Sequence, residues 1–587
     1  MYRRIGSVLL LLCVLAFSFC ARKSGDIVLR NGKIYTMEAR MPWASAVVIN
    51  GNIITDVLVN DTDVGKYIGT STKVIDLNGR FAVPGFIDSH THFASAGEMI
   101  NDANLLAVAD DEGLRKEIQR VVGIVGEGEW ITGGLWGAYE EWAQGAEKAG
   151  GKKKGRWEPT RSVIDDSTPK NPCLLNSYDY ALFLANTAAL KAVGLENAKL
   201  DGMKVDKNGR PTGLIYSGSK ALELLRAELR KHPKSEERLL NESRAGMKKL
   251  AESGIVEIHD ITDDAQMKRY IKLQETGELT ARVWMRPDLA RAEEFKQKGI
   301  KMGTHPVTGK PDHYLRWGAF KGYIDGIMGT HSALFFEPYT DQPNNYGNFR
   351  THTSDDPELK IGNMDKMYAY IKTAYDAGFV VNVHAIGDKG VALMLDMYER
   401  MMKDLGKSLE GYRVIHAQVI RPQDFPRFKQ LHVIAEVNPY HLSDDMRWME
   451  ERIGSERCKG AYAFKSLLDN GAVLIFGSDW PGTSAAEYYV HPKYLLNAAV
   501  TRTTVNHTPE GGWFPEQKIS IQEALKAYTI NAACATFEQD VKGSIKKGKL
   551  ADITVLDRNL MEIDPKDILN TTVEMTIVGG KIVYERK

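Results

Sequence analysis

The chain has 587 residues, which is too long for one small domain and long enough to bury a large core without disulfide bonds. Hydrophobic residues make up 43% and charged residues 26%, so the composition excludes a wholly disordered chain. Lys+Arg and Asp+Glu are both 76, so the formal net charge is zero and the basic excess of a typical nucleic-acid-binding protein is absent.

The first twenty residues have the pattern of a secretory signal peptide. Arg3 and Arg4 precede an apolar stretch over residues 5–19, which is short for a membrane-spanning helix of about 20 residues. Cys20 follows at the place of the lipid-modified cysteine of bacterial lipoproteins, which this segment resembles. We therefore expect residues 1–20 to be a signal peptide of the lipoprotein type. The mature chain would be exported and tethered to a membrane only through this lipid, with free periplasmic or extracellular secretion and an uncleaved anchor as the alternatives.

Both ends of the remaining chain have the pattern of short β-strands. Asn-Gly occurs between apolar runs at Asn31, Asn50 and Asn78, and this dipeptide is a strong hairpin signal. About sixty residues at the other end show the same pattern of short apolar runs, for example in ADITVLD and EMTIVGGKIVYER. We expect residues 25–82 and 527–587 to build one composite β-sandwich.

Strand and helix patterns alternate in the middle of the chain. Eight apolar, β-branched runs can be counted, at residues 81–93, 254–260, 281–287, 317–326, 378–387, 412–420, 431–439 and 472–480. Alternation of this kind predicts a parallel sheet, and eight such strands predict an α/β fold with a (β/α)8 TIM-type barrel over residues 83–526. The gap between the first two runs is too long for a loop, so we expect an inserted subdomain at about 94–250.

Residues that bind metals in other proteins lie near the ends of several predicted strands. His90 and His92 are two positions apart in VPGFIDSHTHF, so on a strand they point to one face. Lys321 interrupts an apolar run, and a lysine is rarely buried without a partner. The later runs contribute His384, His416 and Asp479. In a barrel all of these side chains would meet at the carboxyl end of the strands.

This pattern resembles the amidohydrolase superfamily, and within it the branch of metal-dependent hydrolases that includes N-substituted formamide deformylases. The resemblance runs from about residue 26 to residue 587. It includes the stretches NGKIYTM, VPGFIDSHTHF, LRWGAFKGYIDG, VNVHAIGD, RVIHAQ, FGSDWP and GSIKKGKLADITVLD.

The resemblance implies one or two divalent metal ions, with zinc as the expected metal. His90 and His92 would bind one ion together with Asp479, and His384 and His416 would bind a second. Lys321 would bridge the two as a carbamate, which offers two oxygen ligands where an ammonium offers none. The alternative for Lys321 is an unmodified lysine paired with Asp325.

The implied reaction is hydrolysis of a non-peptide carbon–nitrogen bond in a small amide, formamide or cyclic amide by metal-bound hydroxide. Asp479 would move the proton, and His441 or His331 would hold the carbonyl oxygen. Two alternatives remain, a heterocycle deaminase and a catalytically inactive metal-binding lipoprotein. The expected partner is the small-molecule amide, with no nucleic acid and a possible homodimer.

Aromatic residues are expected to form the wall of the substrate pocket. The candidates are Trp136, Tyr139, Trp142, Tyr178, Tyr323 and Trp480. The chain departs from the branch pattern at Ala181, Ile415 and Asn438, where the branch usually has histidine, glutamate and glutamine. Because the candidate ligands are kept, these departures are expected to alter the substrate rather than the metal site.

Overall fold

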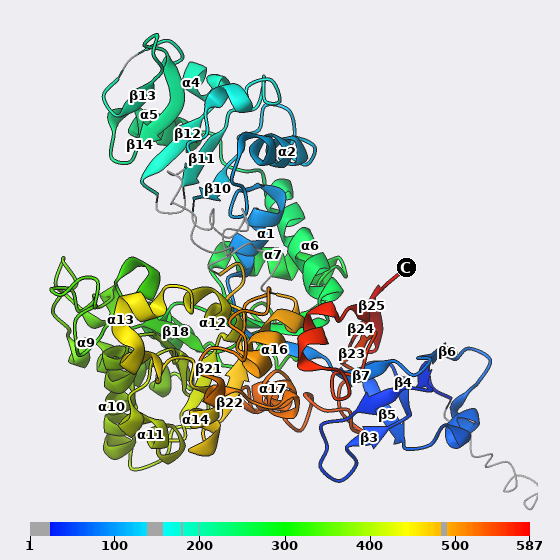
Figure 1. The fold of residues 1–587 in the computed structure, drawn as a ribbon. Coiled ribbons are helices and arrows are strands. Elements are labelled where there is room, and N and C mark those ends of the chain that lie inside the picture. Colours follow the sequence, from blue (N-terminus) through cyan, green and yellow to red (C-terminus); the bar gives the residue numbers. More distant parts are fainter. Residues whose placement is uncertain (1–23, 138–156, 178–179, 199, 483–489) are drawn as a thin grey trace, which may run out of the picture.

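The computed structural model describes residues 24–137, 157–177, 180–198, 200–482 and 490–587 (Figure 1). The expected signal peptide with Cys20 and three pocket-wall candidates, Tyr139, Trp142 and Tyr178, lie outside these residues. Within the described ranges, the helices are all too short or too polar to cross a bilayer.

Strands from both ends of the chain share one sheet, in the order β25-β24-β23-β7-β2-β3. Its centre is the antiparallel pair of β7 (Phe81–Pro84) and β23 (Ile553–Leu556). The other strands are β2 (Lys33–Tyr35), β3 (Trp43–Ala44), β24 (Val573–Val578) and β25 (Lys581–Glu585). In Figure 1 the blue and red ends of the chain meet in this region.

A second sheet, ordered β5-β4-β1-β6, packs against the first. It consists of β1 (Ile27–Arg30), β4 (Ala46–Asn50), β5 (Ile53–Leu58) and β6 (Lys73–Asp76). Leu29 and Val47 of this sheet share a buried apolar cluster with Ile553 and Ile577 of the other. The apolar side chains that these strands turn toward one another therefore build a common core between the sheets.

The predicted strand over residues 81–93 is two strands, which corrects the sequence-based boundary. β7 ends at Pro84, and β8 (Phe86–Thr91) begins after Gly85. A Cβ atom at Gly85 would lie 2.2 Å from Cγ1 of Val256, so only glycine permits this close approach. The short break passes the chain from the two-sheet region into the parallel strands.

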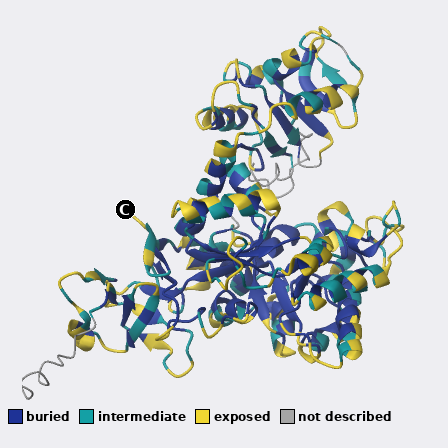
Figure 2. Cartoon of the chain, turned by 180° about the vertical axis from the view of Figure 1, so that it is seen from behind, coloured by how far each residue is buried: buried dark blue, intermediate teal, exposed yellow. Residues whose placement is uncertain are grey.

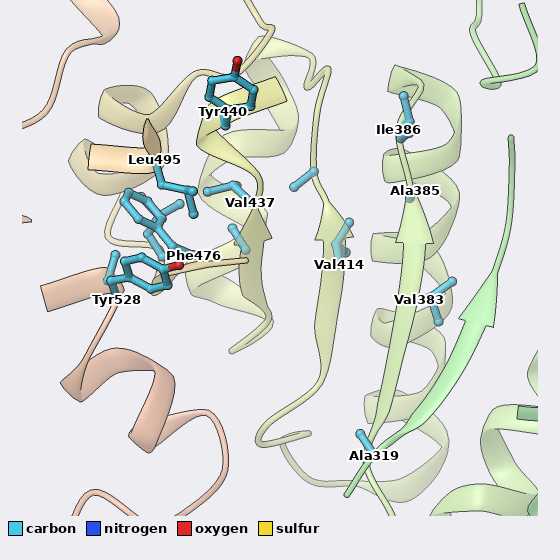
Figure 3. Packing of buried hydrophobic residues seen from close by; sticks show 14 of the residues in the cluster. Ala319, Val383, Ala385, Ile386, Val414, Val437, Tyr440, Phe476, Leu495 and Tyr528 are labelled. Atoms are coloured by element: carbon cyan, nitrogen blue, oxygen red, sulfur yellow. The ribbon is translucent and has the colours of Figure 1, made fainter. Parts of the chain in front are cut away.

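The parallel strands form two sheets, ordered β17-β16-β15-β8 and β18-β19-β20-β21-β22. In the described part of the chain, each of the eight predicted runs overlaps at least one of these strands, and the run at 317–326 overlaps two. They are β8, β15 (Ile255–Ile261), β16 (Arg282–Arg286), β17 (Leu315–Trp317) with β18 (Phe320–Tyr323), β19 (Val381–Ala385), β20 (Arg413–His416), β21 (Ile434–Val437) and β22 (Leu474–Phe476). Neighbouring arrows point the same way in Figure 3, where Val383, Val414 and Val437 belong to adjacent strands.

Backbone contacts join the two parallel sheets at two places. The amide of Lys321 in β18 donates to the carbonyl of Pro287, which follows β16, at 2.8 Å, beside the bridge between Asp288 and Lys321. The amide of Asp479, which follows β22, donates to the carbonyl of His90 in β8 at 2.7 Å. The segment after the last of these strands thus contacts the first strand.

Helices between the strands cover them from outside. Examples are α7 (Asp264–Glu275), α9 (Met364–Asp376), α10 (Asp388–Leu405) and α17 (Ile521–Ala527). Asp263 is the N-cap of α7 and its side chain accepts from the amide of Gln266, and α10 buries Val391, Leu395 and Tyr398. Figure 2 shows the result, with buried strands at the centre and exposed residues on the outer helices.

The chain between β8 and β15 forms a separate sheet, in the order β13-β14-β12-β11-β10-β9. Its strands are β9 (Ala103–Asn104), β10 (Gly133–Trp136), β11 (Leu174–Ser177), β12 (Leu182–Ala185), β13 (Met203–Val205) and β14 (Pro211–Tyr216). In Figure 1 it stands at the top, reached through α1 (Phe93–Asn101) and α6 (Glu236–Glu252). It has apolar clusters of its own, and Trp136 is buried in one of them.

Candidate functional site

The metal-ligand candidates line one cavity of about 680 Å³. They lie at or just beyond the carboxyl ends of β8, β19, β20 and β22, while Lys321 lies within β18. The cavity is lined by His90, His92, Lys321, His384, His416 and Asp479, together with His441. The structure therefore brings together the six proposed ligands and one of the two histidines proposed to hold the carbonyl oxygen.

His90 is fully buried and held through its Nδ1 atom. Nδ1 lies 2.7 Å from a carboxylate oxygen of Glu436, which can only accept, so Nδ1–H donates. Nη2 of Arg286 donates to the carbonyl of His259 at 2.9 Å and also lies 3.0 Å from Nδ1 of His90. Burial is the main cause that lowers the pKa of His90 to about 4. His90 is therefore neutral, with a lone pair on Nε2.

That lone pair faces an acceptor. Nε2 of His90 lies 3.2 Å from Oδ1 of Asp479, and Nε2 of His92 lies 3.1 Å from the same oxygen. Burial raises the pKa of Asp479, whereas a proton on either neighbouring imidazole, His90 or His92, would lower it well below its usual range. An ionised carboxylate and an imidazole lone pair at this separation repel each other unless a cation lies between them.

His416 and His384 are oriented by different partners. Nδ1 of His416 donates to the side-chain oxygen of Asn438 at 2.7 Å, and the Asn438 amide donates to the carbonyl of Gly477 at 2.9 Å. Nε2 of His384 donates to the carbonyl of Gly326 at 3.1 Å. In the described part of the chain the other ring nitrogen of each histidine has no hydrogen-bond partner, and the two ring centroids are 4.4 Å apart.

The backbone is strained at two of these residues. His416 has φ of +69° and Asp479 has φ of +62°, both in the left-handed region that a side chain makes unfavourable. Such positions cost about 1–3 kcal/mol each and occur preferentially where function holds a side chain in place. Both side chains point into the cavity that they line.

Lys321 is 1% exposed, and among the described residues its Nζ has no hydrogen-bond partner. Asp325 instead accepts from the backbone amides of Leu334 and Gly387, both at 2.9 Å. The alternative pairing of Lys321 with Asp325 is therefore wrong. Burial, reinforced by Arg286, lowers the pKa of Lys321 to about 7, so a large fraction of the amine is uncharged at neutral pH.

Two sets of side chains have the spacing of a metal site. His90, His92 and Asp479 form one set, and His416, His441 and Asp479 form the other, with ligand atoms within 4.8 Å of one another. Nε2 of His441 is buried without a hydrogen-bond partner among the described residues and lies 3.7 Å from Oδ2 of Asp479. Ligand atoms about 3 Å apart suit one ion whose bonds are about 2.0–2.2 Å long, so these residues fit a divalent metal.

His331 does not line the cavity, although it was one candidate for holding the carbonyl oxygen. Its Nε2 lies 2.8 Å from a carboxylate oxygen of Asp341, and Arg452 also contacts its ring. The geometry therefore favours His441 over His331 for that role.

The predicted aromatic wall is mostly elsewhere. Of the candidates in the described residues, Tyr323 lines the cavity, whereas Trp136 is buried in the separate sheet and Trp480 packs on Phe93. Trp448, which sequence reasoning did not single out, lines the cavity instead.

Sequence reasoning also missed the buried charges beneath the ligands. Glu436 lies 2.9 Å from a guanidinium nitrogen of Arg286 and 2.9 Å from one of Arg413, and all three side chains are fully buried. The signal was available, because Glu436 is a charged residue inside the apolar run VIAEV, as Lys321 is in its own run.

Comparisons with known proteins agree with this architecture. A family model described as Amidohydrolase family matches residues 73–584. Protein LONG AFTER FAR-RED 3 of Arabidopsis thaliana is 32% identical over 582 residues, covering 95% of this chain and 91% of that protein. N-substituted formamide deformylase of Arthrobacter pascens is 24% identical over 587 residues, covering 96% and 98%.

A solved structure with a similar fold covers most of this chain. It is an uncharacterized metal-dependent hydrolase from Pyrococcus furiosus, with 25% identity and a TM-score of 0.68. The match covers 91% of this chain and 100% of that chain.

Proposed function

The chain belongs to the amidohydrolase family, and from that premise we propose that it cleaves a non-peptide carbon–nitrogen bond in a small amide, formamide or cyclic amide. The family and the candidate ligands together suggest that this hydrolase depends on a divalent metal. The relationship to N-substituted formamide deformylase supports formamides as the first substrates to test.

One observation carries the proposal. The Nε2 lone pair of His90 faces an ionised oxygen of Asp479 at 3.2 Å, and the buried Nζ of Lys321 lines the same cavity. Such groups are costly to bury unless they are paired or bind a metal. A divalent cation would satisfy them together.

We propose zinc, because neutral imidazole and carboxylate ligands suit it. His90, His92 and Asp479 would hold one ion, and His384 and His416, with His441 close by, would hold a second where two are bound. When bound, the metal supplies Lewis acidity, which lowers the pKa of water and polarises a carbonyl. The amine of Lys321 is partly uncharged at neutral pH and has no hydrogen-bond partner among the described residues, so it is suited to react with carbon dioxide, and the carbamate would offer the metal site two oxygen ligands.

We propose that Asp479 transfers the proton and that His441 stabilises the negative charge that develops on the carbonyl oxygen. Because the pKa of Asp479 is held well below its usual range, its carboxylate is ionised at neutral pH and can accept a proton from water. It can then deliver this proton to the leaving nitrogen. Burial lowers the pKa of His441, so its neutral ring can donate one hydrogen bond to the carbonyl oxygen as negative charge develops.

The wider organisation is also proposed. The parallel strands would close into a (β/α)8 barrel over residues 83–526, with a subdomain inserted at about 94–250 and the composite sandwich at 25–82 and 527–587. Residues 1–20 would direct export, with Cys20 as the lipid-bearing residue. The cavity at the carboxyl ends of the strands is where barrels of this kind place their active sites.

Metal analysis and a substrate screen test the proposal. Purified protein should contain one or two equivalents of a divalent metal and should hydrolyse at least one of a set of formamides, acylated amines and cyclic amides. Release of an amine supports amide hydrolysis, whereas release of ammonia from an aminated heterocycle supports the deaminase. Metal binding without turnover of any compound would support the remaining alternative, a catalytically inactive metal-binding protein.

A further inference from the structure

Arg350 is held rigidly beside the candidate metal site. It follows β18, and its backbone amide donates to the carbonyl of Ile324 at 3.0 Å. Its side-chain Nε donates to the carbonyl of Asp325 at 3.1 Å. These two bonds fix both the backbone and the direction of the guanidinium group, which lines the cavity together with Lys321 and His384.

The two outer nitrogens of Arg350 are free. Within the described parts of the chain, Nη1 and Nη2 have no hydrogen-bond partner, and no carboxylate lies within ion-pair distance of the group. A guanidinium whose Nε is already engaged presents its remaining N–H groups as a fork that matches a carboxylate.

Apart from Asp479, the acidic residues that line the cavity have other partners. Asp288 lies 3.0 Å from Nε2 of His352. Asp445 accepts from the amide of Gln418 at 2.9 Å and from the hydroxyl of Tyr462 at 2.6 Å. Neither of them neutralises Arg350.

The other arginine of the cavity, Arg452, is engaged. Its Nη1 donates to the carbonyl of Gly329 at 3.0 Å and contacts the ring of His331 at 2.8 Å, and its Nε lies 3.5 Å from Asp341. Arg452 therefore supports the loop around residues 328–331 and has Asp341 as a counter-charge, whereas Arg350 has no ion-pair partner among the described residues.

Part of the cavity wall is apolar. Ile327, Met328, Ile386 and Trp448 line it, and Figure 3 places Ile386 just beyond the end of β19, the strand that carries His384. A ligand in this cavity would therefore have an apolar part as well as a group for Arg350.

We propose that Arg350 is a specificity-determining residue that binds a carboxylate of the substrate. The substrate class is then an amide that carries, apart from its scissile bond, an anionic carboxylate joined by an apolar spacer. This inference rests on the proposed function, because it names the substrate of the same site.

The test compares two series of formamides of increasing chain length. One series ends in a carboxylate, and the other consists of the N-alkylformamides of matching length. The metal-loaded wild-type enzyme should show a higher kcat/KM for the carboxylates at one spacer length. Arg350→Gln should lower that preference by about 10- to 100-fold, as expected for losing a hydrogen bond to a charged group, and should leave the neutral series within a few-fold. Arg350→Lys should keep part of the preference.

Arg452→Gln is the matched control, because it removes a charge from the same cavity while leaving the free fork in place. This variant should preserve the ratio of kcat/KM between the carboxylate series and the neutral series. A wild-type enzyme that prefers neutral formamides, an unchanged ratio in Arg350→Gln, or a loss of the ratio in Arg452→Gln alone would each overturn the inference.

Failure of the proposed function is distinguishable. If no formamide, acylated amine or cyclic amide is turned over, the hydrolase proposal fails, and calorimetry with the carboxylate series still tests Arg350. Wild-type protein should bind these compounds more tightly than Arg350→Gln does, and equal binding would exclude the carboxylate site. Melting curves verify that both arginine variants are folded.

Discussion

Glu436 accepts a hydrogen bond from Nδ1 of His90 at 2.7 Å, although the two residues are 346 positions apart in the chain. The bond selects the tautomer of His90 whose Nε2 carries the lone pair, and it aims that lone pair at Asp479. A carboxylate behind a ligating histidine also makes the imidazole a stronger ligand. Glu436 is therefore a positioning residue for the proposed metal site.

Glu436→Gln should weaken metal binding by about 10- to 100-fold, the usual effect of removing such a support. Glutamine keeps the size of the side chain but not the charge, so the His90 tautomer is no longer enforced. Metal affinity can be measured by titration of the metal-free protein with a competing chelator. An affinity equal to that of the wild type would show that Glu436 has only a structural role.

The same variant also leaves Arg286 and Arg413 without their full counter-charge, so a loss of stability is expected as well. Glu257→Gln is the control for this effect. Glu257 is an equally buried glutamate on a parallel strand, and it pairs with Arg316 at 2.9 Å. The Glu257→Gln variant should lower the melting temperature without weakening metal binding.

Lys321→Ala should lower metal content and activity together, because the proposed carbamate supplies oxygen ligands. Short carboxylates added to the assay should restore part of both, since they replace those oxygens in the space left by the side chain. Metal content by elemental analysis and activity are measured on the same samples. If the variant retains its full metal content, Lys321 does not belong to the metal site.

Asp479→Asn should lower kcat by about 10²- to 10⁴-fold, the range for losing a general acid–base group. Asparagine can occupy the same space but cannot accept a proton. The histidines and Lys321 should still retain much of the metal, so the loss of rate should exceed the loss of metal. Kinetics with metal content measured in parallel test this, and a variant within a few-fold of the wild-type rate would rule out the proposed proton transfer.

Cys20→Ala should release the protein into the soluble fraction of the cells that export it. The basic and apolar start of the chain ends at this cysteine, and two acyl chains with an acylated amine anchor a protein stably where one chain is marginal. Fractionation followed by immunoblotting measures the distribution. Variant protein that stays in the membrane fraction would exclude Cys20 as the anchor.

Features that depend on local spacing were predictable from the sequence. Two histidines at positions i and i+2 share one face of a strand, so His90 and His92 were expected to act together, and the structure places both beside Asp479. The alternation of apolar runs and helical patterns likewise located a strand in each of the eight runs. The apolar run over residues 81–93 does not indicate where the strand is divided, however. The division lies at Gly85, where the backbone approaches Val256 closely.

What the sequence by itself determined is the family resemblance, the order of the strands and the set of candidate ligands, because each depends on residue types and short spacings. The tertiary structure alone decided which groups face those ligands. It placed Glu436 behind His90, turned His331 toward Asp341, and left the outer nitrogens of Arg350 without a hydrogen-bond partner among the described residues. These contacts join residues from different strands and loops, and their energies depend on burial and direction, which no local pattern encodes.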